Sequence, residues 1–159
     1  MSVEFQVREI LPGSPERVFQ ALTDLEAAAQ WMPGYVTIER VGEVQEGMGM
    51  RWRETRKVFG KEATEEFEVT HYNPPAHLAL RVDGSRGSSG SGVYEFDYRL
   101  AQRVGGTEVT LNGRVDGLPA PMRLLGPLLA IPFKRACVKD LRALANHLRQ
   151  IEGATPAAS

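Results

Sequence analysis

Glu54, Arg56 and Glu65 are the residues whose types and spacing best suit proton-transfer chemistry. If Phe59-Gly60 forms a two-residue hairpin turn, the flanking strands place Glu54 directly opposite Glu65, with Arg56 on the same face. Two carboxylates so placed repel each other, and Arg56 can bridge both. Inside a cavity, one carboxyl would have a raised pKa and act as general acid or base. Alternatively, the three residues lie in solvent at the end of the sheet.

The other reactive residue types form no recognisable constellation. The three histidines, His71, His77 and His147, are far apart and lack the spacing of metal ligands, so we expect no metal site and no cofactor. By alternation His71 faces inward, as either a core histidine or a pocket donor, and His147 lies on the surface. Cys137 falls on an apolar helix face, which favours a buried, inert thiol over a nucleophile.

Most of the chain has the two-residue alternation of half-buried strands. The hairpin register would also set Trp52 opposite Phe67, an apolar pair that supports it. Short turns join the segments, so we expect one antiparallel sheet. Seven strands are predicted at Val3–Val7, Val36–Arg40 (with Val36 and Ile38 on one face), Met48–Val58, Lys61–Thr70, Leu78–Val82, Tyr94–Leu100 and Val109–Val115.

Helical patterns appear after the first strand and at the end of the chain. Ser14 and Asp24 are predicted N-caps of two short helices, reaching about Thr23 and Trp31. The segment Pro132–Ile151 has the period of an amphipathic helix, about 30 Å long. Its predicted apolar face comprises Cys137, Leu141, Leu144, Leu148 and Ile151. A long amphipathic helix needs a broad apolar surface, so we predict an α+β fold with the sheet wrapped around it.

Two connecting segments are candidates for the mouth of a cavity. The loop Asp83–Gly92, rich in glycine and serine, is either flexible or ordered by whatever it touches. The proline-rich stretch 118–133 should contain helical turns around Met122–Leu125. Its apolar side chains either pack on the open end of the sheet or line an entrance.

Composition narrows the function classes. The net charge of −1 gives no basic footprint for nucleic acid. A hydrophobic fraction of 42% and a single cysteine suit a cytoplasmic globular protein, and nothing resembles a signal peptide. No apolar run is long enough for stable membrane insertion. We expect one domain over 1–152 and a disordered tail over 153–159; the sequence leaves the oligomeric state open.

This order of elements resembles the START-like, Bet v 1-like helix-grip superfamily (SRPBCC), and most closely its polyketide cyclase/dehydrase-type branch. The resemblance covers about residues 3–151 and rests on a strand, SPERVFQALTDLEAAAQWMPG, hairpin strands, NPP, a GGTEVT strand and a terminal amphipathic helix. It implies a seven-stranded antiparallel sheet that grips the last helix, with an apolar cavity between them. Members include lipid carriers, hormone and quinone binders, and aromatase/cyclases, so the fold alone does not define a function.

The sequence therefore predicts a protein that binds, or binds and transports, a hydrophobic small molecule such as a lipid, polyketide or isoprenoid. The alternative is a polyketide cyclase, aromatase or dehydratase that uses the inward polar residues as general acid or base. A protein-binding role ranks last, because the predicted outer faces are charged. The inward aromatics either fill the core or line the pocket. The predicted ligand-binding residues are Trp31, Trp52, Glu54, Arg56, Phe67, Tyr94, Phe96, Tyr98, Met122, Leu125 and Leu129.

Overall fold

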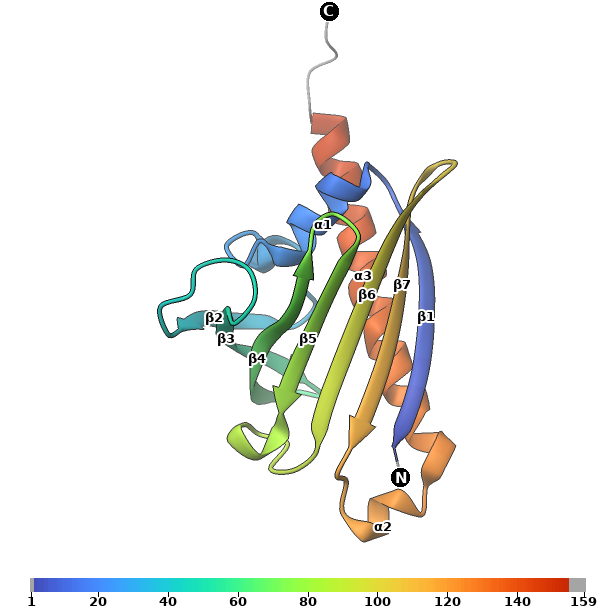
Figure 1. The fold of residues 1–159 in the computed structure, drawn as a ribbon. Helices are drawn as coiled ribbons and strands as arrows, with labels where there is room; N and C mark the ends of the chain where they lie inside the picture. Colours follow the sequence, from blue (N-terminus) through green and yellow to red (C-terminus); the bar gives the residue numbers. More distant parts are fainter. Residues whose placement is uncertain (1, 155–159) are drawn as a thin grey trace, which may run out of the picture.

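The computed structural model describes residues 2–154, in which a seven-stranded antiparallel sheet curves around the long helix α3 (Ala130–Ala154) (Figure 1). The strand order is β1-β7-β6-β5-β4-β3-β2. This is the α+β arrangement that the sequence predicts. The strands are β1 (Val3–Leu11), β2 (Tyr35–Val41), β3 (Arg51–Val58), β4 (Lys61–Asn73), β5 (His77–Asp83), β6 (Val93–Arg103) and β7 (Gly106–Asp116).

The connection between β1 and β2 carries the chain from one edge of the sheet to the other. It contains α1 (Pro15–Thr23) and the 3₁₀ turn η1 (Ala28–Gln30). Ser14 caps α1 as predicted, because its side chain accepts from the backbone N–H of Arg17. Asp24 accepts from the N–H groups of Glu26 and Ala27 in the turn before η1, but the N-cap of η1 itself is Ala27, so that predicted cap is wrong. The second predicted helix is shorter than expected, a single 3₁₀ turn.

The hairpin of β3 and β4 has the predicted register. Glu54 lies opposite Glu65, and Trp52 lies opposite Phe67. Phe59 and Gly60 have φ values of 51° and 77°, and positive φ at both central residues is characteristic of the type I′ turns that match strand twist. The turn therefore fixes which side chains of β3 face α3.

Two β-bulges reverse side chains that simple alternation places inward. The register of β2 against β3 shifts between Tyr35 and Thr37, which leaves Val36 36% exposed rather than on the inner face with Ile38. The register of β4 against β5 shifts between Val69 and His71. His71 is consequently exposed, so the prediction that it faces inward is wrong.

Helix α3 lies against the concave face of the sheet (Figure 1), and its apolar side chains belong to the core cluster between the two. Leu141, Leu144 and Leu148 are buried as predicted, and truncating any one to alanine would cost about 2–5 kcal/mol. Ile151 is 42% exposed, so the buried face ends one turn earlier than the sequence pattern suggests. The helix starts two residues before the predicted Pro132, which a first turn accommodates because its N–H groups have no intrahelical acceptor.

The end of α3 overlaps the segment that the sequence assigns to a tail. The helix continues through Gly153 to Ala154. The remainder of that predicted tail, 155–159, lies outside the described residues.

Near its start, α3 rests on the sheet through aromatic rings. The Phe5 ring of β1 lies over Gly113, its partner on β7, where an added Cβ would collide with it. Phe5 also stacks on Phe133 of α3, with ring centroids 6.3 Å apart and planes 8° apart. Gly113 thus provides the space in which this contact between sheet and helix forms.

The loop between β5 and β6 is held by β4. It begins with the 3₁₀ turn η2 (Gly84–Arg86). The Ser88 N–H donates to the carbonyl of Thr64 at 2.8 Å, and the Ser88 hydroxyl accepts from the Thr64 N–H at 2.8 Å. Of the two alternatives for this segment, the structure shows the loop ordered by the strand it touches.

The proline-rich connection to α3 contains α2 (Ala120–Arg123) and the 3₁₀ turn η3 (Gly126–Leu129). The predicted helical turns are therefore present. However, most of its large apolar side chains neither pack on the sheet nor line a cavity: exposed fractions are 41% for Met122, 89% for Leu124, 50% for Leu125 and 64% for Leu128. Among residues 2–154, no helix has the length and apolar character that crossing a membrane requires.

Candidate functional site

A cavity of about 200 Å³ lies between the sheet and α3. Its walls come from the segment between α1 and β2, from strands β3 to β7 and from one side of α3. Most lining side chains are apolar, which is typical of a small-molecule pocket. Seven of the residues predicted from the sequence line it: Trp31, Trp52, Glu54, Arg56, Phe67, Phe96 and Tyr98.

The other predicted pocket residues lie elsewhere. Tyr94 packs edge-on against Phe133 in a second apolar cluster, with ring centroids 5.7 Å apart. Leu129 packs against that same cluster. Met122 and Leu125 are largely exposed. These four residues belong to the end of the molecule around α2, whereas the cavity lies farther along α3.

Stacked aromatic rings form one wall. Trp52 and Phe67, paired across β3 and β4, have centroids 5.4 Å apart and planes 4° apart. Because the hairpin register places them side by side, the pair presents a broad, rigid apolar surface to the cavity.

The polar end of the cavity is built around Arg56. Its guanidinium makes two hydrogen bonds to the Asp140 carboxylate of α3, at 2.9 and 2.7 Å, and Nε donates to the Pro33 carbonyl at 2.9 Å. Oε1 of Glu54 lies 3.5 Å from the same guanidinium. This arrangement fixes the guanidinium plane and joins β3 to α3.

Glu54 is the most deeply buried carboxylate of the site, with 6% of its surface exposed. Burial raises its pKa, while Arg56 and a 3.4 Å hydrogen bond from the Trp52 indole N–H act in the opposite direction without cancelling the effect. Burial also opposes the charge of Arg56, but its bonds to Asp140 and Glu54 outweigh that and raise its pKa. Arg56 therefore stays charged beside a carboxyl that gains a proton more readily than usual.

Two further polar groups face the cavity. Tyr98 of β6 is partly buried in the cavity wall, and loss of hydration there raises its pKa well above the usual 10.0. Among residues 2–154, its hydroxyl has no hydrogen-bond partner. Burial raises the pKa of the Cys137 thiol to about 12. Both groups are thus neutral near pH 7, and Tyr98 remains a hydrogen-bond donor.

Glu65 does not join this group, although the register is as predicted. Its Oε1 accepts from the Ser89 N–H at 2.7 Å and from the Ser89 hydroxyl. Its Oε2 lies buried where a side chain at Gly87 would collide with it. Arg56 therefore bridges Glu54 to Asp140, and not to Glu65 as the sequence suggested.

Sequence reasoning missed Asp140 as a site residue. It follows Lys139 on what looked like the polar face of the helix, and nothing in the local pattern distinguished it. Its only signal was an acidic side chain three residues after Cys137 on a helix expected to face Arg56.

The cavity opens between α3 and the segment that follows α1. Asp24 and Ala136 both line the cavity and are exposed to solvent. Trp31 and Met32 lie on the same side. Residues of the loop between β5 and β6 do not line the cavity, and of the predicted proline-rich stretch 118–133 only Phe133 does.

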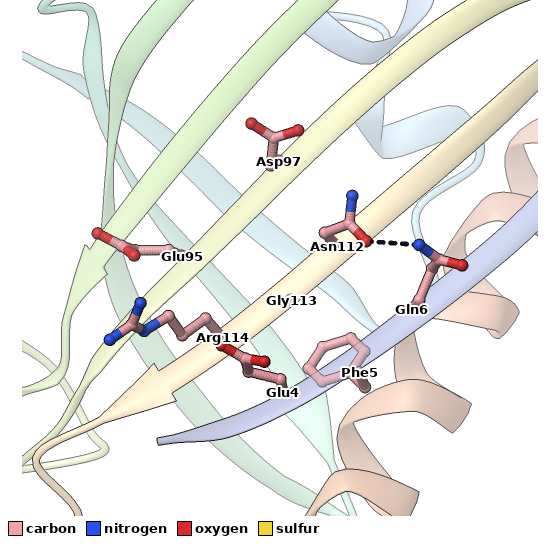
Figure 2. A pocket seen from close by; sticks show the side chains of 8 residues that line it. All are labelled: Glu4, Phe5, Gln6, Glu95, Asp97, Asn112, Gly113 and Arg114. Atoms are coloured by element: carbon pink, nitrogen blue, oxygen red, sulfur yellow. Dashed lines mark hydrogen bonds between the residues drawn. The ribbon is translucent and has the colours of Figure 1, made fainter. Parts of the chain in front are cut away.

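A second depression, of about 580 Å³, lies on the outer face of the sheet (Figure 2). It spans β1, β7 and β6. Figure 2 shows the Gln6 amide donating to Asn112, at 2.8 Å. Its side chains are mostly polar and exposed, unlike those of the internal cavity, which makes it a poor match for an apolar ligand. The lining residues are Glu4, Phe5, Gln6, Glu95, Asp97, Asn112, Gly113 and Arg114.

Solved structures with the same fold include an aromatase/cyclase and the protein Ara h 8.0201. The aromatase/cyclase ZhuI from Streptomyces sp. R1128 has a TM-score of 0.78 at 17% identity, over 99% of this chain and all of that one. Ara h 8.0201 has a TM-score of 0.73 at 16% identity, over 94% of this chain and 99% of its own. A protein from Thermus thermophilus has a TM-score of 0.70 at 20% identity, over 98% and 100% of the two chains. At these identities the likeness shows the fold alone, which is the helix-grip fold of the Bet v 1-like proteins.

A family comparison covers nearly the whole sequence. No curated protein sequence matches the chain. The sequence profile described as polyketide cyclase/dehydrase and lipid transport matches residues 2–149. The match spans every strand and almost all of α3, and it agrees with the resemblance seen in the sequence. The chain belongs to the polyketide cyclase/dehydrase and lipid transport family.

Proposed function

We propose that this protein binds a hydrophobic small molecule that carries one polar group, in the cavity between the sheet and α3. The observation that carries the proposal is the division of the cavity into apolar walls and one polar end. The Trp52–Phe67 stack supplies apolar contact area. Tyr98 supplies a hydroxyl that no described side chain engages, so a ligand carbonyl or hydroxyl would satisfy it.

The volume of the cavity limits the size of the part of a ligand that it can enclose. An apolar cavity of about 150 Å³ suffices for benzene, so 200 Å³ accommodates roughly one substituted ring or a short acyl segment. A longer lipid, polyketide or isoprenoid would place one end inside, while the rest leaves between Asp24 and Ala136. We therefore expect recognition of one end of the ligand, with looser requirements beyond it.

The first test is native mass spectrometry of the purified protein, followed by organic extraction and identification of bound molecules. The proposal expects a noncovalent adduct that is lost on denaturation. The variant Ala136→Trp places a large ring at the opening and should remove the adduct. Lys139→Trp is the matched control, because Lys139 is an exposed residue of the same helix outside the cavity. Adduct retention in Ala136→Trp, or loss in both variants, would argue against this cavity as the site.

A cyclase, aromatase or dehydratase activity is the second candidate, and a specific observation favours it. Glu54, with a raised pKa, lies beside a permanently charged Arg56 in the same cavity as Tyr98. The ionised Glu54 carboxylate would take the α-proton of a β-hydroxy ketone, and the protonated carboxyl would then give that proton to the leaving hydroxyl, which departs as water as the C=C bond forms. Arg56 and Tyr98 would hydrogen-bond the carbonyl oxygen on which negative charge develops. Of the polar residues that an enzyme should bring together, however, Glu65 and His71 point elsewhere.

Dehydration of a synthetic cyclic β-hydroxy ketone, followed by the absorbance of the conjugated product, distinguishes the two candidates. An enzyme should accelerate the reaction and lose at least about a hundredfold in rate in Glu54→Gln, a typical general-acid contribution. A binder should show no acceleration of the reaction. It should also bind its ligand equally well in wild type and in Glu54→Gln.

A further inference from the structure

We propose that the segment Met122–Ile131, with the basic residues beside it, docks the protein on the surface of an anionic membrane. The segment comprises α2, η3 and the start of α3, at the end of the molecule opposite the β6–β7 turn (Figure 1). This proposal concerns the outer surface, and it holds whether or not the internal cavity binds a ligand.

The first observation is the exposure of large apolar side chains along this short segment. Leu124 is 89% exposed and Leu128 is 64% exposed. Met122, Leu125 and Ile131 are each between 41% and 50% exposed. Single exposed apolar residues are ordinary on protein surfaces, but five within one short segment are unusual and are typical of a segment that contacts another surface.

The second observation is the sign of the charge around these residues. Between Asp116 and Asp140 the chain contains Arg123, Lys134, Arg135 and Lys139 and no acidic residue, although the whole chain has a net charge of −1. Arg123, Lys134 and Arg135 are exposed. Among residues 2–154, none of these three forms an ion pair.

Together these features suit the interface of an anionic bilayer. Leucine and isoleucine side chains enter the boundary between headgroups and acyl chains, while nearby arginine and lysine side chains contact lipid phosphates. No helix among residues 2–154 can span a membrane, so the contact is peripheral and reversible. A second copy is a poorer occupant, because a symmetric contact would bring the same unpaired cations of both copies together.

The experiment is co-sedimentation of the full chain with vesicles of phosphatidylcholine alone and of phosphatidylcholine mixed with phosphatidylglycerol. We expect binding to the anionic vesicles, weakened by added sodium chloride, and little binding to the neutral ones. The double variant Leu124→Gln/Leu128→Gln should reduce partitioning by at least about tenfold, since two leucine side chains no longer enter the bilayer. Both side chains are exposed, and circular dichroism confirms that the variant folds.

Val104→Gln is the matched control. Val104 is fully exposed but lies in the β6–β7 turn at the other end of the molecule, so this variant should bind as wild type does. Three results would overturn the proposal: no binding to anionic vesicles, equal binding by the double leucine variant, or a concentration-dependent dimer that the same variant dissolves. The last would assign the surface to a second copy. A vesicle-binding failure would leave the mass-spectrometric test of the cavity unaffected.

Discussion

The guanidinium of Arg56 in β3 binds the carboxylate of Asp140 in α3 through two hydrogen bonds, across 84 positions of sequence. The pair connects β3, which lies next to the edge strand β2, to the middle of the helix. Because both residues line the cavity, the same bond that joins the two layers also forms the polar end of the site. A change at this pair should therefore alter both the stability of the fold and the polar end of the cavity.

Asp140→Asn should destabilise the protein by about 1–3 kcal/mol. The amide cannot match two charge-assisted hydrogen bonds, and Arg56 is then left partly buried beside Glu54 alone. The range is at the lower end for such pairs because Asp140 retains 31% side-chain exposure. Urea denaturation measures the change. Asp116→Asn is the control, since its 2.7 Å pair with Arg114 is exposed, and it should cost much less than Asp140→Asn. Equal costs for both changes would contradict this account.

The free energy of unfolding of Glu54→Gln should rise relative to that of wild type as the pH increases above 4.5. Burial raises the pKa of Glu54 in the folded protein from 4.5, so the unfolded chain releases this proton first. Wild type then loses stability from pH 4.5 up to the folded pKa, because the folded protein still holds a proton that the unfolded chain has released. Glutamine has no proton to lose. Denaturation curves across this range provide the measurement, and a wild type that gains stability relative to the variant would refute it.

Tyr98→Phe should leave the free energy of unfolding within about 0.5 kcal/mol of wild type, because the hydroxyl has no hydrogen-bond partner to lose within the described part of the chain, 2–154. Ligand affinity should fall by about 2- to 10-fold, the range expected for one neutral hydrogen bond. Titration of whichever ligand is extracted gives the affinity. Tyr94→Phe removes a hydroxyl outside the cavity and should leave affinity unchanged.

Cys137 should react very slowly with iodoacetamide at pH 8. A pKa of about 12 leaves a thiolate fraction about three orders of magnitude below that of an ordinary cysteine. Mass spectrometry of the native protein against a urea-unfolded sample measures the ratio. Rapid modification of the native protein would indicate an accessible, ionised thiol and would contradict the buried setting.

The sequence predicted those parts of the site that depend on strand register. Phe59-Gly60 allows one tight turn, and that turn determines that Glu54 and Trp52 face α3 beside Phe67. The register follows from local chemistry, so counting residues from the turn is sufficient. The long helix was equally predictable, since apolar residues that recur with a period near 3.6 over about five turns are typical of an amphipathic helix.

Other features depend on tertiary geometry that a linear pattern does not contain. A bulge before His71 reverses its direction, and no residue type marks that bulge in advance. Glu65 turns to the loop because the Ser89 N–H and hydroxyl are available, a contact 24 positions away. Asp140 enters the site because the packing of α3 on the sheet brings it to Arg56, a residue 84 positions earlier in the chain.

Phe5 lies over Gly113 and stacks on Phe133, so the missing side chain of one strand residue governs how closely the helix approaches the sheet. Gly113 does not line the internal cavity, whereas Phe133, Cys137 and Asp140 do. A methyl group at position 113 would displace the Phe5 ring and push the start of α3 away from the sheet. The lining residues on α3 would move with the helix. The width of the cavity therefore depends on the hydrogen atom at position 113, where any side chain would displace the ring that supports the helix.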